Sequence, residues 1–111
     1  MSVIDNITKH FNDALENNLI KHHVPEWDTD IYYYPTYSFK NEQKIMELQS
    51  KGKTVDALVE SILVKCLDAN GKRLFTDANR AQLMNEADPK LIIRVAGAIN
   101  TGIPDEEYEK N

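Results

Sequence analysis

The segment from Thr54 to Leu67 carries the strongest periodic pattern in the sequence. Its apolar residues recur at intervals of three and four positions: Val55, Leu58, Val59, Ile62, Leu63, Cys66 and Leu67. This spacing places their side chains along one face of an α-helix. Burial of such a set contributes a gross free energy on the order of 10 to 20 kcal/mol, whereas a helix of this length is only marginally stable in isolation. We therefore expect the helix to lie in a core made by this chain, with packing on a second copy as the alternative.

Two further helices and a hairpin are predicted before this segment. A helix over residues 3 to about 17 follows from the spacing of Ile4, Ile7, Phe11, Ala14 and Leu15. The runs "NLIKHHV" and "DIYYYP", on either side of the turn-like "PEWDTD", predict a β-hairpin that ends at Pro35. The next helix is expected to start after Ser38 as N-cap and to run to about Gln49, with Phe39, Ile45, Met46 and Leu48 as its apolar residues.

Small and polar residues mark the ends of the remaining elements. Gly52 breaks the chain, and Thr54 is expected to cap the helix that follows. Asp88 and Pro89 form an N-cap followed by proline at the first helical position, and Gly102 suits a C-terminal cap. The last helix carries the apolar residues Leu91, Ile92, Val95, Ala96 and Ile99.

The stretch "CLDANGKRLFTDANRAQLM" contains the triplet Asp-Ala-Asn twice. A calcium loop would need glycine at its sixth position and glutamate at its twelfth, and neither is present when counting from Asp68. We interpret residues 68–71 as a turn in which Asn70 and Gly71 adopt left-handed backbone. Thr76 or Asp77 then opens a short helix, and Leu74 and Phe75 are expected to anchor the connector in the core.

The whole chain is thus expected to fold as one mainly α domain of four to five helices with a single short β-hairpin after the first helix. Its boundaries are placed at residues 1–103, followed by a disordered acidic tail over 104–111. A net charge of −5, without any block of Lys or Arg, argues against a nucleic-acid partner. No apolar run reaches the ~20 residues of a membrane span, and a single cysteine requires no oxidising compartment.

Three catalytic or ligand-binding hypotheses fail on residue geometry. His22 and His23 are adjacent in a predicted strand, so their side chains point to opposite faces and are poorly placed to share a metal ion, with or without His10. The tripeptide "NGK" is too short for a phosphate-binding loop. Cys66 belongs to the apolar helix face, which favours a buried structural thiol over a nucleophile. We expect no enzyme activity, no cofactor and no metal.

Two motifs resemble those of a known family. Val24-Pro25-Glu26-Trp27 and the run from Asn70 to Asp77, "NGKRLFTD", are similar to the "VPEWG" and "DGKRLF…FTD" elements of tail assembly chaperones of long-tailed bacteriophages and prophages. The resemblance extends over roughly residues 5–100. The family usually has glycine where Asp28 stands and an acidic residue where Asn70 stands, and Tyr32 to Tyr34 are more aromatic than the pattern.

The resemblance implies a protein that is not an enzyme and works in the host bacterial cytoplasm during phage assembly. Such chaperones bind the long helical tape measure protein, keep it soluble until the tail tube forms, and are absent from the mature virion. The implied partners are the tape measure protein, other copies of the chain and, as a further candidate, the tail tube protein. A small structural or adaptor protein of the virion is the alternative.

Exposed aromatic side chains are enriched at protein interfaces, which makes the hairpin and the connector candidate contact surfaces. In the hairpin, Tyr32 and Tyr34 should share one side, and Ile31 and Tyr33 the other. The predicted residues for partner binding or self-association are Trp27, Tyr32, Tyr34, Leu74 and Phe75.

Overall fold

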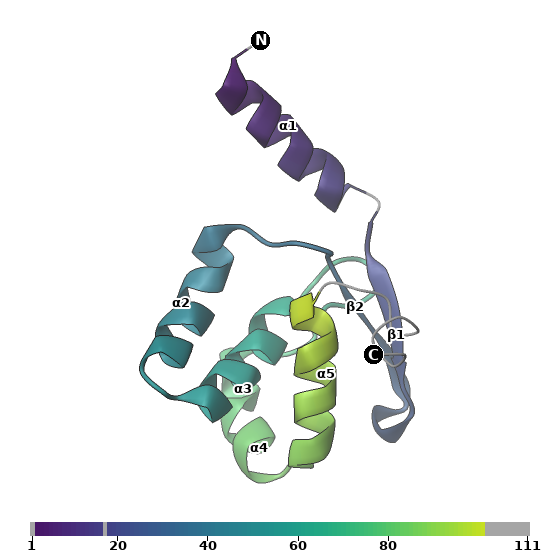
Figure 1. Cartoon of the computed structure of the whole chain (residues 1–111). Coiled ribbons are helices and arrows are strands. Elements are labelled where there is room, and N and C mark those ends of the chain that lie inside the picture. Colours follow the sequence, from purple (N-terminus) through teal and green to yellow (C-terminus); the bar gives the residue numbers. More distant parts are fainter. Residues whose placement is uncertain (1, 17, 102–111) are drawn as a thin grey trace.

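A computed structural model describes residues 2–16 and 18–101 of the chain. These residues form α1 (Val3–Leu15), β1 (Ile20–Val24), β2 (Thr29–Tyr33), α2 (Phe39–Ser50), α3 (Thr54–Lys65), α4 (Arg80–Asn85) and α5 (Pro89–Thr101), with short 3-10 helices η1 (Pro25–Trp27) and η2 (Asp77–Asn79) (Figure 1). The predicted class, mainly α with one antiparallel hairpin after the first helix, is confirmed. The predicted acidic tail at 104–111 and the cap at Gly102 lie outside the described residues.

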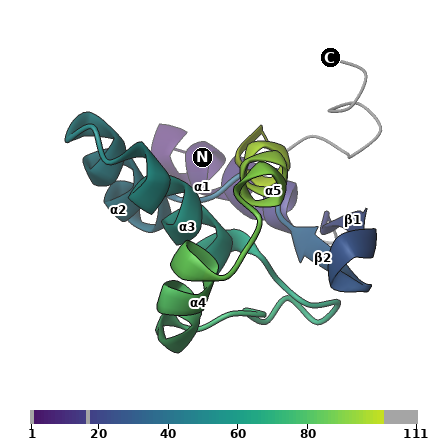
Figure 2. The same cartoon turned by 90° about the horizontal axis from the view of Figure 1, so that it is seen from below.

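Helix α3 is the central element of the domain. It packs against both α2 and α5, while α4 lies close to its first turns and the hairpin lies on the other side of α5 (Figures 1 and 2). Val59, Ile62 and Leu63 are buried within this single chain, so the expected intramolecular packing of the helix is confirmed. Val55 departs from the predicted stripe: it lies in the first turn of α3 and remains 61% exposed.

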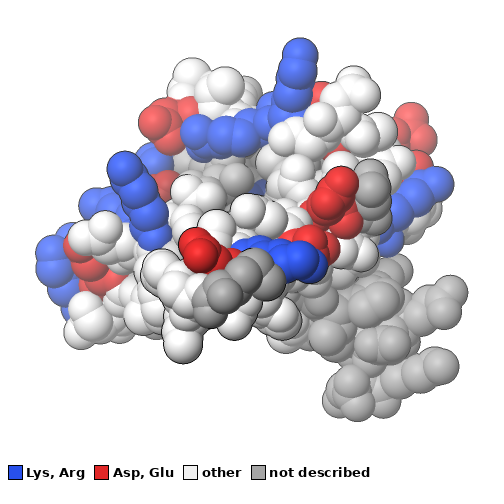
Figure 3. All heavy atoms as spheres, turned by 90° about the horizontal axis from the view of Figure 1, so that it is seen from above, with Lys and Arg blue, Asp and Glu red and all other residues white. Residues whose placement is uncertain are grey.

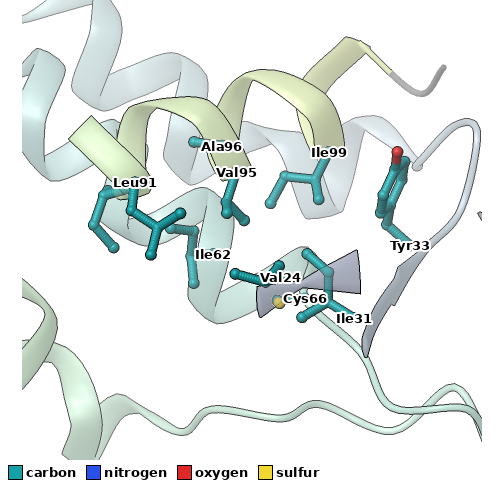
Figure 4. Close-up of a cluster of buried hydrophobic side chains, with 10 residues drawn as sticks. Val24, Ile31, Tyr33, Ile62, Cys66, Leu91, Val95, Ala96 and Ile99 are labelled. Carbon is teal, nitrogen blue, oxygen red and sulfur yellow. The ribbon is translucent and has the colours of Figure 1, made fainter. Parts of the chain in front are cut away.

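The main core joins the hairpin to α3 and α5. It consists of Val24, Ile31, Tyr33, Ile62, Cys66, Leu91, Ile92, Val95, Ala96 and Ile99 (Figure 4). All of the apolar residues predicted for the last helix belong to this set. Ile31 and Tyr33 point into the core and Tyr32 does not, as strand alternation predicts.

Local hydrogen bonds explain where the helices begin. Ser38 Oγ accepts the Asn41 N–H at 3.3 Å, and Asp88 Oδ1 accepts the Lys90 N–H at 3.0 Å, which confirms both predicted caps. Of the two residues proposed to open the short helix, Thr76 holds the cap position, and its N–H donates to Asn79 Oδ1 at 2.9 Å.

The predicted cap at Thr54 is wrong, because α3 already includes Thr54 and Lys53 occupies the cap position without a side-chain bond. The cause is the preceding turn. Gly52 has φ +74°, its N–H donates to the Gln49 carbonyl, and the Lys53 N–H donates to the Leu48 carbonyl. This hydrogen-bond pair is a Schellman motif, which ends α2 and delivers the chain directly into α3.

The turn after α3 is held by its first residue. Asp68 Oδ1 accepts the N–H groups of Asn70 and Lys72 at 2.8 and 3.0 Å, and Gly71 has φ +80°. The prediction for Asn70 is wrong: among the described residues other than glycine, only Asp28 has positive φ, at 50°. Asp28 ends η1 in left-handed backbone, a conformation that favours glycine.

Cys66 and Leu67 follow the end of α3. They are buried, but not as part of the apolar face of that helix. Leu67 exchanges backbone hydrogen bonds with Tyr32, at 2.8 and 2.9 Å, and also forms a bridge with Arg73. The connector is thereby tied to the outer edge of the hairpin. In the described part of the chain, no helix has both the length and the apolar character needed to cross a membrane.

Helix α1 differs from the other long helices because none of its residues is buried. It leads away from the helical layer at one end of the molecule (Figure 1), which contributes to principal extents of 50 × 31 × 29 Å. Ser2 caps it by accepting the Asp5 N–H at 3.2 Å. The predicted helix is present, but its apolar face is only partly covered: Val3, Ile4 and Ile7 are exposed, whereas Phe11, Ala14 and Leu15 are half-buried.

Candidate protein-binding surfaces

An apolar pocket forms where the two resemblance motifs meet. We call it the Trp27 pocket; it has a volume of about 280 Å³ and is lined by Trp27, Thr29, Leu74, Phe75, Leu83 and Ala87. The rings of Trp27 and Phe75 meet edge to face, with centroids 6.0 Å apart and planes inclined by 78°. η1 presents Trp27, and the connector presents Leu74 and Phe75. The structure therefore brings together three of the predicted contact residues.

Leu74 and Phe75 have different environments within this pocket. Phe75 packs against the main core, whereas Leu74 is 37% exposed. The expectation that both anchor the connector is correct for Phe75 only. Consecutive side chains of an extended segment point in opposite directions, so only one of the two can face the core.

Tyr32 and Tyr34 lie away from the Trp27 pocket. Tyr34 makes an edge-to-face contact with Tyr37, with ring centroids 5.9 Å apart. Tyr37 Oη accepts the Tyr34 N–H and donates to the Lys65 carbonyl, each at 3.1 Å, and burial raises the pKa of Tyr37 to about 12. Both predicted tyrosines are half-buried, and Tyr34 serves to hold the segment between β2 and α2.

A larger apolar cleft lies between α1 and α2. This α1–α2 cleft has a volume of about 760 Å³, and its apolar lining includes Ile7, Phe11, Tyr37, Phe39, Met46 and Ile99. Phe39 is 82% exposed. Sequence reasoning missed this site, although Phe39 stands directly after an N-cap, at a position where a helix does not need a large aromatic residue for its own core.

A buried polar cluster lies below the cleft. The Lys65 side chain is 3% exposed, pairs with the Glu42 carboxylate, and donates to Asn100 Oδ1 at 2.8 Å. Its ammonium group also lies 5.1 Å from the centroid of the Tyr37 ring. These contacts connect α2, α3 and α5, and they fix the position of α2 relative to the core.

Several titratable groups of the described residues are buried or hydrogen-bonded. Burial raises the pKa of Cys66 to about 12, which keeps its thiol protonated. His22 is buried and His23 is exposed, as strand alternation predicts, and the His23 Nδ1 atom lies 2.7 Å from Asp30 Oδ1. This hydrogen bond lowers the pKa of Asp30, and the hydrogen bond from Arg94 similarly lowers the pKa of Glu26. No group of three or more His, Cys, Asp or Glu that could hold a metal occurs in the described part of the chain.

Charges of both signs are mixed over the surface near α1. Seen from the α1 end, Lys and Arg side chains alternate with Asp and Glu, and uncharged side chains separate them (Figure 3). This face shows no extended basic stripe of the kind that follows a phosphate backbone. The Trp27 pocket and the α1–α2 cleft are candidate recognition surfaces, because apolar side chains line both and both could accept an apolar protein segment.

Comparison with known proteins identifies a structural relative. The sequence matches no protein-family model and no curated protein. The chain is similar to the solved structure of the bacteriophage HK97 tail assembly chaperone, with a TM-score of 0.55 and 16% sequence identity. The match covers 86% of this chain and 94% of the HK97 chain. At this identity the likeness concerns the fold, and the chain has the fold of a bacteriophage tail assembly chaperone.

Proposed function

We propose that the chain is a phage tail assembly chaperone that binds a tape measure protein, keeps it soluble and leaves before the virion is mature. The observation that carries the proposal is the fold shared with the HK97 chaperone over most of both chains. The sequence motifs support it independently, because they meet in one apolar pocket. The role requires no catalytic group and no cofactor, and it belongs to the cytoplasm of the host bacterium that carries the phage or prophage.

The Trp27 pocket is the proposed contact for the tape measure protein. A long helical protein with exposed apolar side chains aggregates unless these are covered, and a helix is commonly recognised through apolar anchors three or four residues apart. The pocket has the size for one such anchor. Its aromatic wall consists of Trp27 and Phe75, which both pack against the core. Self-association of the chaperone would repeat such pockets along the rod, and the tail tube protein is a further candidate partner.

Coexpression with the tape measure protein of the same phage tests this function. We expect the wild-type chain to keep the tape measure protein soluble and to copurify with it. The variant Leu74→Asp should lose copurification, because it places a carboxylate in the pocket. Val55→Asp is the matched control, since Val55 is also exposed and does not line this pocket.

Two results would contradict the proposal. The first is an insoluble tape measure protein that never copurifies with the wild-type chain. The second is the presence of this chain at fixed stoichiometry in purified mature tails, which would instead support a structural or adaptor protein of the virion.

A further inference from the structure

Glu26 stands next to Trp27 in the Val24-Pro25-Glu26-Trp27 motif but does not line the Trp27 pocket. Val24 is fully buried in the main core, and Trp27 forms part of the pocket wall. The side chain of Glu26 is instead 49% exposed and contacts α5. The motif therefore contains a charged residue whose place in the structure the pocket alone does not explain.

Glu26 forms a two-pronged ion pair with Arg94 of α5, which is 68 positions away in the sequence. Arg94 Nη2 donates to Glu26 Oε1 at 3.0 Å, and Arg94 Nη1 donates to Glu26 Oε2 at 3.2 Å. The hydrogen bond from Arg94 lowers the pKa of Glu26, so the carboxylate is ionised at neutral pH. A bidentate pair between arginine and a carboxylate fixes the orientation of the two groups as well as their distance.

The 3-10 helix η1, which carries both Glu26 and Trp27, is the tip of the hairpin. It lies between the paired residues Val24 and Thr29, and the hairpin lies beside α5 (Figures 1 and 2). Glu26 attaches this tip to α5, and the Trp27 ring attaches it to Phe75 of the connector. Two side chains that are adjacent in the sequence therefore hold the tip against two separate parts of the fold.

The two attachments differ in how strongly they orient the tip. Apolar contact is not directional, because its free energy depends on the area removed from water. The contact between the Trp27 and Phe75 rings thus leaves the tip some freedom to shift, whereas the two hydrogen bonds of Arg94 specify one position relative to α5. A binding site that is held in its bound arrangement binds more tightly, since fewer groups have to be ordered when the partner arrives.

We propose that Arg94 is a positioning residue for the Trp27 pocket: through Glu26 it holds η1 so that Trp27 is in place to receive an apolar anchor of the tape measure protein. The inference rests on the proposed function and adds to it a residue outside the pocket, because Arg94 does not line it. It also gives the glutamate of the motif a role in recognition that differs from direct contact with the partner.

Fluorescence of the full chain tests the positioning without any partner, because Trp27 is the only tryptophan in the sequence. We expect Glu26→Gln and Arg94→Gln each to raise the acrylamide quenching constant of Trp27 about twofold, as the loss of one partly exposed ion pair would allow. The near-ultraviolet circular dichroism of Trp27 should weaken, while the far-ultraviolet signal stays unchanged. Lys90→Gln is the matched control, since it removes a positive charge from an exposed position one turn earlier in α5.

The double variant separates a shared contact from two independent effects. Because Glu26 and Arg94 act through the same ion pair, the chain that carries both glutamines should be quenched no more than either single variant. Additive increases would overturn the proposal. So would variants that unfold at lower urea concentration but keep the wild-type quenching constant when folded, because the ion pair would then stabilise the fold without positioning Trp27.

Coexpression with the tape measure protein of the same phage tests the consequence for binding. We expect Glu26→Gln and Arg94→Gln to reduce the amount of copurified tape measure protein about two- to fivefold, and Lys90→Gln to leave it unchanged. Unchanged copurification by variants whose Trp27 has become more accessible would overturn the proposal. If the wild-type chain binds no tape measure protein, the proposed function fails, whereas the quenching experiment still decides whether Arg94 positions Trp27.

Discussion

Single residues of this protein show how closely side-chain direction follows local periodicity. In the hairpin, alternation separates buried His22 from exposed His23, and buried Tyr33 from half-buried Tyr32. Directly after α3, Cys66 lies inside the core with no exposed surface. The chemical character of these residues therefore depends on which face of a short element they occupy.

The thiol of Cys66 should be inert in the native protein. Because burial raises its pKa to about 12, the thiolate fraction near pH 8 is on the order of one in ten thousand. We expect no modification by a small disulfide reagent within minutes at pH 8, followed by complete modification after unfolding in urea. Rapid stoichiometric labelling of the folded chain at this pH would show that the residue is accessible and that the core around it is open.

At the scale of elements, turns and polar contacts position the helices. The Schellman motif at Gly52 joins α2 to α3, and the Lys65 cluster holds α2 against the core through Glu42. The turn at Gly71 reverses the chain, so that Arg73 pairs with Leu67 and the Leu74 N–H donates to the Cys66 carbonyl. These connections depend on two glycines with positive φ, which lie in different surroundings.

Alanine substitutions at these glycines should separate backbone strain from side-chain contact. Both replacements introduce left-handed strain of about 1 kcal/mol. An added Cβ at Gly52 meets no atom within 4 Å, whereas one at Gly71 lies 3.2 Å from Tyr34 Oη. We therefore expect Gly71→Ala to destabilise the fold by about 2 kcal/mol and Gly52→Ala by about 1 kcal/mol in urea denaturation. In the Tyr34→Phe background the excess at Gly71 should shrink, and an unchanged excess would contradict this explanation.

At the scale of the whole molecule, the chain divides into a packed body and the projecting α1. All residues of the main core lie between Val24 and Ile99. The body therefore contains the hydrophobic burial that stabilises the fold, while the apolar side chains of α1 stay at least partly exposed.

Deletion of residues 2–18 should leave the body folded. Since α1 contains no buried residue, we expect the free energy of unfolding of a single copy to fall by about 1 kcal/mol or less. Urea denaturation of the full and the shortened chain measures this difference. A shortened chain that fails to fold would show that α1 belongs to the core.

Much of the fold follows from the sequence alone. Periodicity located the helices and the hairpin, and polar residues such as Ser38 and Asp88 located the helix starts, because these signals act between residues close in the chain. The cap predicted at Thr54 is wrong, because the turn at Gly52 determines that boundary and places Lys53 at the cap position. The two motifs that resemble the tail assembly chaperones could also be recognised in the sequence, and they predicted the chaperone fold.

The tertiary structure determines which apolar side chains stay exposed on the surface. The sequence of α1 and that of α5 are both amphipathic, yet only α5 is buried, because burial depends on which elements meet in space rather than on the pattern of either helix. For the same reason Trp27 and Phe75 form one pocket while Tyr34 belongs to another region, and the α1–α2 cleft could not be predicted. Residues that are close in the sequence determine where helices and turns form. A binding surface, in contrast, consists of the apolar area that stays exposed after segments distant in the sequence have packed together.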